Sequence, residues 1–560
     1  MSLNLTRRRF LALSGAASAL GLLAACQQPA APSPTAVAKA AEPTKAPAVP
    51  EPPKIQATTA PTTAPAATQA PAATKTAGPK TGGTYTIAKT AGIENFSPLS
   101  VRPGHFAHMR AIFNTLAHYD DKLTLQPELA TKWDFAPDGK TLTLKLREGV
   151  KYHSGREFTS ADVKATWEYA IVDEVVTLRA MYKNIKNVET PDKYTAILKF
   201  DSVFPGAYDI LDTLYMMDKD SIKNINNTGI GTGPFKLDKY IPNDREELVA
   251  FKDYWETGKP YLDRMTIRVI PDLSTLAINL ESGAVDCVWQ PNYTDLVRLR
   301  DQGAGKYVVD MGTPGANFFD IGINTKQEPF TNKKVRQAIA WSIDRARFCK
   351  TTLQGLDEPT CLGWPKISWG YQKDLEGKIG FDLDKAKGLL KEAGLEGGFE
   401  AEIMTSSKQS FGMGDLAQLL QGDLAKIGIK GKIADVDTAV YNTRMNTKRD
   451  ISIAVHTYGR CNRDPGSLLT GAIAYYVDKE GTWTKLENAE YEKVRAEANS
   501  MLERDKRLPL LRRAQEIMLD ECCTNVVAPQ QRPWAYAKYV KGFALDHDNS
   551  PLVAEYWLEK

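Results

Sequence analysis

Apolar and polar positions alternate or recur at helical spacing from about residue 84 onward. Residues 84–88 alternate as a strand does, directly after Gly82-Gly83. Residues 131–135 and 141–146 alternate on both sides of a Pro-Asp-Gly-Lys turn at 137–140, which predicts a hairpin.

Helical spacing is found between these strand signals. Thr159 fits a helix N-cap because Asp162 follows three positions later, at the start of a helical run over 163–167. The apolar positions within 335–343 and 386–393 predict two more helices, and 267–270 and 451–455 predict strands. This irregular alternation predicts an α/β chain with mixed sheets.

Residues 26–80 show neither periodicity. They are rich in Pro, Ala and Thr and contain almost no large apolar side chain, so they cannot bury a core. At ~3.1 Å per residue, an extended chain of this kind reaches on the order of 100 Å. We expect a disordered tether.

Residues 1–25 have the order of an export signal. A basic segment at 7–9 precedes an apolar or small stretch over 11–25, which is too short and too rich in Gly and Ala for a membrane span. Arg7-Arg8 with Phe10-Leu11 resembles the twin-arginine signal. Residues 23–26, Leu-Ala-Ala-Cys, resemble the bacterial lipobox.

That resemblance implies that Cys26 is acylated and becomes the first residue of the mature protein. The alternative is an ordinary cysteine in a discarded signal. Acylation predicts an extracytoplasmic protein, periplasmic or on the outer face of the plasma membrane, that contacts the membrane through its lipid anchor.

Composition excludes other classes of protein. Hydrophobic residues make up 42% of the 560 positions and charged residues 25%, as in soluble globular proteins. With 71 basic and 68 acidic residues the net charge is +3, which is too small for a surface that tracks phosphates, so we expect no nucleic-acid partner.

The chain shows none of the common catalytic patterns. It has no Walker A, His-Glu-x-x-His or Gly-x-Ser-x-Gly sequence. The glycine-rich run at 229–233 is followed by Pro234, which favours a turn over a dinucleotide site. His105 and His108 have no further ligand nearby, so we expect them to be solvated or at a rim, and His153 to serve a loop. We expect no enzyme activity, cofactor or metal.

Six cysteines remain after Cys26. Their even number permits disulfides in an oxidising compartment, and Cys349 with Cys361, which flank one loop, is the best candidate pair. Buried free thiols are the alternative.

Several motifs together resemble one family. They are Pro-Glu-Leu-Ala at 127–130, the Asp-Gly-Lys-Thr hairpin at 138–141, Lys-Leu-Arg-Glu-Gly-Val-Lys-Tyr-His at 145–153, Thr-Ser-Ala-Asp-Val at 159–163, Gly-Thr-Gly-Pro-Phe at 231–235, Gly-Ala-Val-Asp at 283–286, Asn-Thr at 324–325, Pro-Phe at 329–330 and Val-Arg-Gln-Ala-Ile at 335–339. Their order and spacing over 81–560 resemble the ABC-transporter extracellular solute-binding proteins of family 5, the peptide, oligopeptide and nickel type.

The resemblance implies a large two-lobed fold of the periplasmic-binding-protein kind, type II or cluster C. The first lobe would contain 81–310 and the returning segment 525–560, and the second lobe 311–524. Because the chain crosses between the lobes twice, they could close as rigid bodies about a hinge. The implied partners are a small solute, a permease and an ATPase, and we expect a monomer.

The same resemblance marks a loop at 456–465 that ends in Asp-Pro. Tyr458 matches the aromatic position of peptide binders, whereas Cys461 stands where they carry the aspartate that pairs with the ligand ammonium. A neutral thiol cannot offset a buried ammonium charge. Asp464 could substitute, although a role in shaping the loop is the favoured interpretation.

Arg460 adds positive charge to this loop, so we hypothesise a ligand rich in carboxylate or hydroxyl groups with Arg460 as its anion partner. Arg463 we interpret as a solvated loop residue. Phe96 and Trp289 lie where the family lines its cleft. Trp364 and Trp369 fit a ligand cover and packing on their own lobe equally well.

The sequence therefore predicts the substrate-binding component of an ABC importer that captures a peptide, a peptide-like compound or a solute rich in carboxylate or hydroxyl groups. A surface sensor or adhesion lipoprotein without a transporter is the alternative. A cell-surface hydrolase is a further one, which the missing nucleophile and base disfavour.

Overall fold

The structure is a computed structural model that describes residues 78–100, 105–173, 176–303, 305–313, 317–459, 463–471 and 483–560. The predicted signal at 1–25, Cys26 and nearly all of the predicted tether lie outside these residues. Among the described residues, no helix has both the length and the apolar character needed to cross a bilayer.

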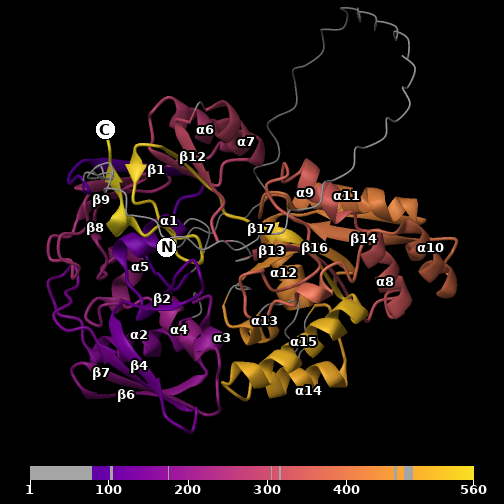
Figure 1. Ribbon diagram of the computed structural model, residues 1–560, viewed down its shortest axis with the longest axis horizontal. Coiled ribbons are helices and arrows are strands. Elements are labelled where there is room, and N and C mark those ends of the chain that lie inside the picture. The colour runs from indigo at the N-terminus through magenta and orange to yellow at the C-terminus, as the bar shows by residue number, and fades with distance from the viewer. Residues whose placement is uncertain are drawn as a thin grey trace, which may run out of the picture. The chain divides into compact units, whose positions relative to one another are not determined.

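The first lobe is built on a seven-stranded sheet in the order β12-β18-β11-β1-β10-β9-β8. Its strands are β1 (Thr84–Lys89), β8 (Phe235–Ile241), β9 (Arg245–Ala250), β10 (Arg264–Val269), β11 (Cys287–Trp289), β12 (Tyr307–Asp310) and β18 (Trp534–Ala537). Strand β1 runs parallel to β10 and β11, while β18 runs antiparallel to β11 and β12. The sheet is therefore mixed, as predicted. Figure 1 shows the yellow C-terminal strands among the indigo and magenta elements of this lobe.

A four-stranded antiparallel sheet extends this lobe. It consists of β4 (Ala130–Phe135), β5 (Thr141–Leu146), β7 (Thr195–Phe200) and β6 (Ile185–Asp192). Two short pairs are β2 (Ala117–Tyr119) with β3 (Leu125–Pro127) and β19 (Val540–Lys541) with β20 (Trp557–Leu558). The lobe's helices are α1 (Phe106–Ile112), α2 (Ser160–Val172), α3 (Arg179–Tyr182), α4 (Ala207–Thr213), α5 (Ile225–Thr228), α6 (Leu273–Glu281) and α7 (Tyr293–Gln302). One apolar core joins both sheets, with Ile87 and Leu144 among its fully buried members.

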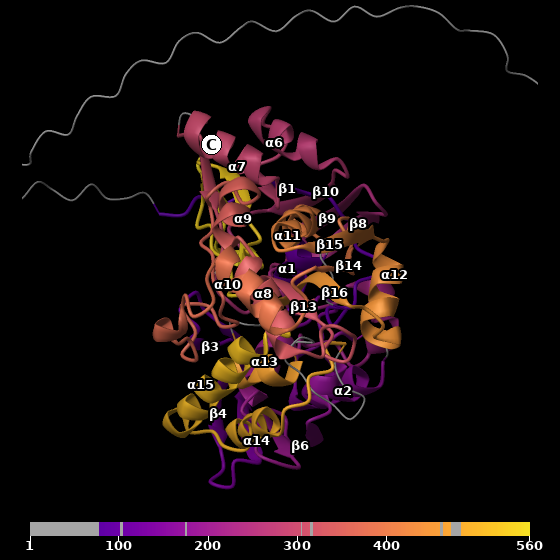
Figure 2. The same ribbon diagram turned by 90° about the vertical axis from the view of Figure 1, so that its right-hand side faces the viewer.

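The second lobe is built on a five-stranded sheet in the order β15-β14-β16-β13-β17. Its strands are β13 (Asn317–Ile323), β14 (Phe399–Thr405), β15 (Ile429–Asp435), β16 (Ile453–Gly459) and β17 (Thr524–Gln530). Its helices are α8 (Lys333–Ser342), α9 (Arg345–Thr351), α10 (Leu383–Glu392), α11 (Met413–Lys426), α12 (Thr438–Thr443), α13 (Pro465–Gly471), α14 (Ala489–Ala498) and α15 (Arg504–Glu521). Figure 2 looks onto α8 and α10, whose apolar faces share a core with α11 and the sheet.

Local signals in the sequence predicted several of these elements. The hairpin forms between β4 and β5, with Trp133 opposite Leu144. The capping box is present because the Thr159 backbone N–H donates to the Asp162 carboxylate at 2.9 Å. The strand predicted at 451–455 instead runs over Ile453–Gly459, because its pairing partner β13 extends that far.

The chain passes between the two large sheets twice. It leaves the first after β12, which ends at Asp310, and enters the second at β13. It returns through 531–533, between β17 and β18. The return predicted at about 525 therefore comes later, because β17 pairs with β13 along its length and belongs to the second sheet.

The glycine-rich run at 229–233 is a turn into β8. A Cβ atom at Gly231 would lie 2.0 Å from the carbonyl oxygen of Ile112. The Gly233 N–H donates to the same carbonyl at 2.9 Å. These glycines therefore allow a close backbone approach to the end of α1, as the turn interpretation expects.

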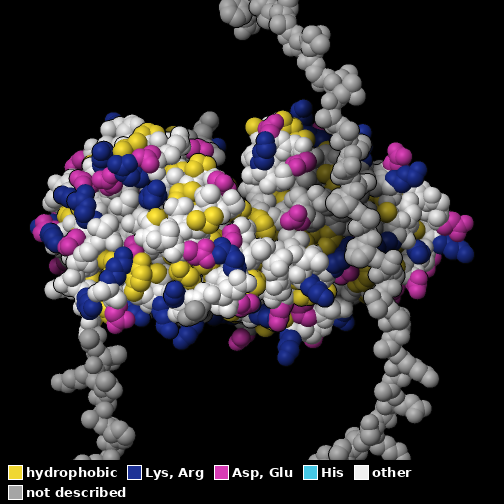
Figure 3. Space-filling model, turned by 90° about the horizontal axis from the view of Figure 1, so that it is seen from above, with side chains coloured by type: hydrophobic (Ala, Val, Ile, Leu, Met, Phe, Trp, Pro, Cys, Tyr) yellow, Lys and Arg dark blue, Asp and Glu magenta, His cyan; other side chains and the backbone are white. Residues whose placement is uncertain are grey.

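The surface agrees with the small net charge. On the face shown in Figure 3, basic and acidic side chains are interspersed over the described residues. This mixture is typical of a soluble surface without a single strong field.

Candidate functional site

Two buried aspartates of α4 accept hydrogen bonds from the second lobe. Asp209 and Asp212 are three residues apart, so they share one face of the helix. Their exposed fractions are 0% and 2%. Burial, together with the nearby charge of Asp464, raises the pKa of Asp209 to about 6. Carboxylates at this depth need polar partners.

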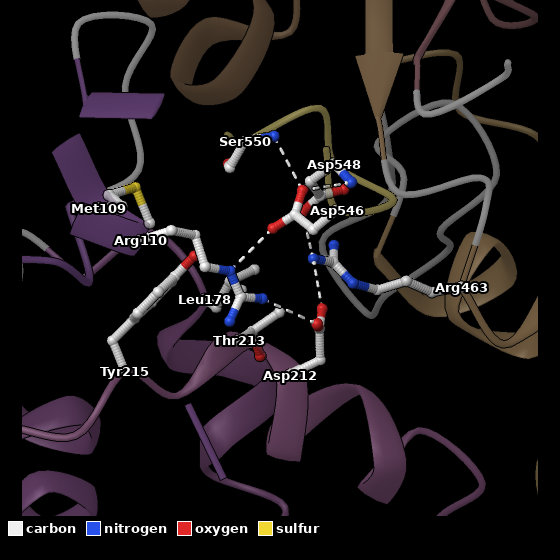
Figure 4. Close-up of a pocket in the computed structure, with 10 residues that line it drawn as sticks. All are labelled: Met109, Arg110, Leu178, Asp212, Thr213, Tyr215, Arg463, Asp546, Asp548 and Ser550. Atoms are coloured by element: carbon white, nitrogen blue, oxygen red, sulfur yellow. Dashed lines mark hydrogen bonds and ion pairs between the residues drawn. The ribbon is translucent and has the colours of Figure 1, made fainter. Parts of the chain in front are cut away.

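Arg110 of α1 connects the acidic residues of the first lobe. Its Nε donates to Asp546 at 2.9 Å, and its Nη2 donates to Asp212 at 3.3 Å (Figure 4). Its Nη1 donates to Glu128 at 3.0 Å. The guanidinium also lies 5.3 Å from the centre of the Tyr215 ring. These contacts fix Asp212 and the C-terminal turn in place.

Arg463 reaches this cluster from the second lobe. It follows β16, and its Nη2 donates to Asp212 Oδ2 at 3.2 Å and also to Asp548 (Figure 4). Burial alone would lower the pKa of Arg463, but the two carboxylates more than offset this and raise it. The interpretation of Arg463 as a solvated residue is wrong, because it is 6% exposed and ion-paired.

The residues after Arg463 attach the same loop to α4. The Ser467 hydroxyl donates to the Asp209 carboxylate, and the Asp464 backbone N–H lies 3.4 Å from Asp209 Oδ1. The Tyr119 hydroxyl donates to Asp209 at 3.1 Å. The loop therefore contacts the first lobe through two acids of one helix and through Asp548 near the C-terminus.

A small cavity of about 30 Å³ lies within this charged cluster (Figure 4). Its lining residues are Met109, Arg110, Leu178, Asp212, Thr213, Tyr215, Arg463, Asp546, Asp548 and Ser550. A space of this size holds one or two water molecules. A larger solute could enter only when the lobes stand further apart.

Tyr458 and Asp464, the predicted ligand-binding residues of this loop that the structure describes, do not line the cavity. Tyr458 is 5% exposed and stacks on Phe318 with ring centroids 6.0 Å apart. The Asp464 carboxylate accepts from Arg507 Nη1 at 2.7 Å and from the Gly466 N–H at 2.9 Å, so it shapes the loop. Arg460 and Cys461 lie outside the described residues.

The other predicted aromatic residues are packed within their lobes. Phe96 is 3% exposed and meets Tyr240 edge to face at 5.1 Å. Trp289 is also 3% exposed, and its ring centroid lies 5.9 Å from that of Trp534. Trp364 is buried and donates to the Pro465 carbonyl at 3.1 Å.

Comparison with known proteins identifies the family. Residues 124–474 match the family described as bacterial extracellular solute-binding proteins, family 5. This match covers more than half of the chain. The chain belongs to family 5 of the bacterial extracellular solute-binding proteins.

Relatives of this solute-binding protein span nearly its whole folded part. The dipeptide-binding protein of Escherichia coli is 28% identical over 495 residues, which cover 81% of this chain and 90% of that protein. Heme-binding protein A of Haemophilus influenzae is 26% identical over 492 residues, covering 80% and 86%. The solved structure of AgaA from A. tumefaciens, in complex with agropinic acid, is 27% identical with a TM-score of 0.73 and covers 85% and 99%.

The family gives this chain its class of function. Family 5 proteins are extracytoplasmic substrate-binding components of ABC importers, and the relatives named above are binding proteins rather than enzymes. The two mixed sheets and the double crossing agree with the periplasmic-binding-protein fold that the solved relatives share.

The solute-binding protein has a second contact between its lobes beside the crossings. Tyr293 of α7 stacks on Phe411 of the second lobe. Its hydroxyl donates to Asp357 at 3.3 Å, and Gln531 Nε2 donates to the same carboxylate at 3.0 Å. Burial raises the pKa of Asp357 to about 6, although both hydrogen bonds oppose the rise.

The bridge predicted between Cys349 and Cys361 is not formed. Both are buried free thiols. Cys349 belongs to the core around the second sheet, whereas Cys361 lies in a separate apolar cluster that it shares with Cys522. Flanking one loop in the sequence did not bring the two sulfurs together.

Three histidines outside the charged cluster, His105, His108 and His153, are packed into the first lobe. His105 and His108 are 1% and 0% exposed, so the expectation that they are solvated is wrong. The Nδ1 of His108 lies 3.2 Å from the Glu246 carboxylate. His153 serves a loop as predicted, since its Nε2 lies 2.9 Å from the Gly233 carbonyl oxygen.

One group among the described residues has the composition and spacing of a metal site. It consists of Asp212, His547 and Asp548, with one ligand atom of each lying within 4.8 Å of the others. The Asp-His-Asp run at 546–548 was visible in the sequence. Its proximity to Asp212 was not, because more than 300 residues separate them.

Proposed function

We propose that this protein binds its solute between the lobes at the cluster of Arg110, Arg463, Asp212 and Asp548 and delivers it to a permease with its ATPase. The observation that carries the proposal is the ion pair from Arg463 in the second lobe to Asp212 and Asp548 in the first. It places opposite charges of the two lobes in direct contact beside a cavity.

The size of the cavity indicates how a solute would enter. Pockets for drug-sized ligands measure about 300–1,000 Å³, whereas this cavity measures about 30 Å³. The lobes must therefore separate at the Arg463 contact before a solute can enter. On closing, the solute would take over some of the partners that these side chains now give one another.

The charges favour a solute with anionic and cationic groups. Arg463 offers a forked donor for a carboxylate, and Asp548 and Asp212 offer acceptors for an ammonium group. These aspartates supply the negative charge that Cys461 cannot. Peptides and peptide-like acids fit this pattern, and the names of the dipeptide-binding and agropinic-acid-binding relatives support it. Arg460 is a further candidate partner for a carboxylate.

The first experiment is mass spectrometry of the small molecules released when the purified protein is denatured. The compound found is then titrated calorimetrically against the wild type, Asp548→Asn, Arg460→Ala and the control Arg513→Ala. Arg513 forms an exposed ion pair with Glu490. We expect Asp548→Asn and Arg460→Ala each to bind the compound at least tenfold more weakly than the wild type, and Arg513→Ala to bind it equally well. Unchanged affinity in Asp548→Asn would overturn the assignment of the site.

We further propose that residues 1–25 direct export and that acylated Cys26 holds a monomer at the membrane. The small-residue lipobox and the Pro-rich tether support this. Cells fed labelled palmitate should label the wild type, whereas Cys26→Ser should be unlabelled and released into the medium. A membrane fraction that retains Cys26→Ser contradicts lipid anchoring. Light scattering of the purified mature chain tests the monomer.

A further inference from the structure

We propose that the first lobe carries a divalent-cation site made by Asp212, His547 and Asp548, and that Arg463 of the second lobe and the cation exclude each other from it. This inference uses the contact between the lobes in the proposed function. It does not depend on which solute the protein binds.

The spacing of the three side chains suits an ion. His547 Nε2 lies 3.3 Å from Asp212 Oδ2 and 3.6 Å from Asp548 Oδ1. An ion bound at about 2.0–2.2 Å holds neighbouring ligand atoms roughly 3.0–3.6 Å apart. The ligand atoms of all three lie within 4.8 Å of one another, so side-chain movements on the order of 1 Å would let one ion bind all three.

Hydrogen bonds from neighbouring groups also orient the candidate ligands. Asp212 Oδ1 accepts from the Tyr119 N–H at 3.2 Å and from Arg110, which leaves its Oδ2 toward His547. The backbone N–H of Asp548 donates to Asp546 at 2.9 Å, which fixes the turn that carries His547. Such supporting contacts orient metal ligands.

Arg463 binds the same two carboxylates, sharing Asp212 Oδ2 with the proposed site and taking the second oxygen of Asp548. Its Nη2 donates to Asp212 Oδ2, the oxygen that faces His547, and to Asp548 Oδ2. The guanidinium therefore takes the Asp212 oxygen that a cation would need and places a positive charge on the Asp548 carboxylate beside it. Because Arg463 belongs to the second lobe and the ligands to the first, withdrawal of the loop would free the site.

The charge balance favours a divalent ion once Arg463 has left. The four carboxylates that pair with Arg110 or Arg463 remain, those of Glu128, Asp212, Asp546 and Asp548, and only the charges of Arg110 and Arg532 act against them. Two negative charges are then uncompensated in a buried setting, which is costly. A divalent cation supplies the matching charge.

The ligand set selects among ions. One imidazole and two carboxylates suit Zn²⁺, Mn²⁺ and similar transition metals, whereas Mg²⁺ prefers oxygen ligands and retains its water. The probes are therefore ZnCl₂ and MnCl₂, with MgCl₂ as the comparison.

The test is calorimetric titration of each salt into metal-free mature protein. The wild type is compared with three variants, Arg463→Gln, Arg463→Lys and Arg463→Met. We expect Arg463→Gln and Arg463→Met to bind one Zn²⁺ or Mn²⁺ at least tenfold more tightly than the wild type, and Arg463→Lys to resemble the wild type because it keeps the competing charge. Equal affinity in all four would overturn the proposal.

Double variants locate the ion. We expect Arg463→Gln with His547→Gln, or with Asp548→Asn, to lose at least tenfold in metal affinity. The matched control combines Arg463→Gln with Asp374→Asn, a carboxylate paired with Arg512 on the surface, and should retain the gain. Metal binding that survives loss of His547 overturns the site. Circular dichroism verifies that each variant is folded.

The test of the cation site can fail or succeed independently of the test of solute binding. Metal binding is measured without solute, and solute binding is measured with chelator present. If the solute fails to bind at this cluster while Arg463→Gln still gains metal affinity, the proposed function is wrong and the cation site stands. The reverse result leaves solute binding intact and removes the cation site.

Discussion

The Tyr293 ring of the first lobe stacks on Phe411 of the second, with ring centroids 5.3 Å apart and ring planes inclined by 16°. This contact is aromatic and lies near the returning segment at 531–533, whereas the contact of Arg463 with Asp212 is ionic. The two contacts between the lobes therefore rest on different physical interactions.

Phe411→Ala should loosen the contact beside the crossings. A stacked aromatic pair contributes about 0.5–1.5 kcal/mol beyond the area it buries, so the ratio of closed to open molecules should fall roughly 2- to 10-fold. Small-angle X-ray scattering would show a larger radius of gyration. Phe381→Ala is the control, since Phe381 is 45% exposed and packs near Lys426 within the second lobe. An equal change in both variants would contradict the prediction.

Asp464→Asn should destabilise the protein strongly. Arg507 is 2% exposed, and the Asp464 carboxylate is its ion-pair partner. Leaving a buried guanidinium without its countercharge costs about 3–5 kcal/mol. Urea unfolding measures the loss. Glu490→Gln, which removes an exposed partner of Arg513, should cost at most about 1 kcal/mol. Similar losses in the two variants would argue against a structural role for Asp464.

The carboxyl group of Asp357 should make stability depend on pH. Burial raises its pKa from 3.8 to about 6, so between these pH values the folded protein holds a proton that the unfolded chain releases. Stability contributed by this group is therefore present below pH 3.8 and is lost as the pH rises to about 6. Asp357→Asn should match the wild type near pH 3.5 and exceed its unfolding free energy by on the order of 3 kcal/mol at pH 7.5.

Urea unfolding at several pH values measures this difference. The exposed substitution Asp121→Asn should change stability by no more than about 0.5 kcal/mol at any pH. A constant difference between Asp357→Asn and the wild type across pH 3.5–7.5 would show that Asp357 does not titrate in this way.

Cys349 and Cys361 should each carry an alkyl label after unfolding without reductant. In the native protein the labelling should be slow, because both thiols are buried and burial raises the pKa of Cys349 to about 12. Peptide mass spectrometry measures both states. Detection of a disulfide-linked peptide that contains both cysteines would contradict the free thiols of the structure.

Local patterns predicted much of the fold. The hairpin at 131–146 and the capping box at Thr159 depend on residues within one turn or one strand pair, so the sequence alone specifies them. The bounds of β16 were missed by two to four residues, because the ends of a strand are set by its partner β13, whose paired residues lie 130 or more positions away. The same reason moves the returning segment from 525 to 531.

The candidate site was less predictable than the fold. The sequence directed attention to the loop at 456–465, and this loop does approach the first lobe. The ion pair to the first lobe is made by Arg463. No local pattern favoured this residue, because an arginine in a polar loop is usually solvated. Its partners Asp212 and Asp548 lie on two other segments of the chain.

By itself, the sequence of this protein determined the α/β class and, through its ordered motifs, the family, and it carries the pattern at residues 6–26 from which we propose export and lipidation. These depend on short segments or on composition. Only the tertiary structure decided which charges are buried, that Cys349 and Cys361 are apart, and that Asp212, His547, Asp548 and Arg463 meet. Burial, and contacts between residues hundreds of positions apart, arise from the packing of the whole chain. No local sequence pattern encodes that packing.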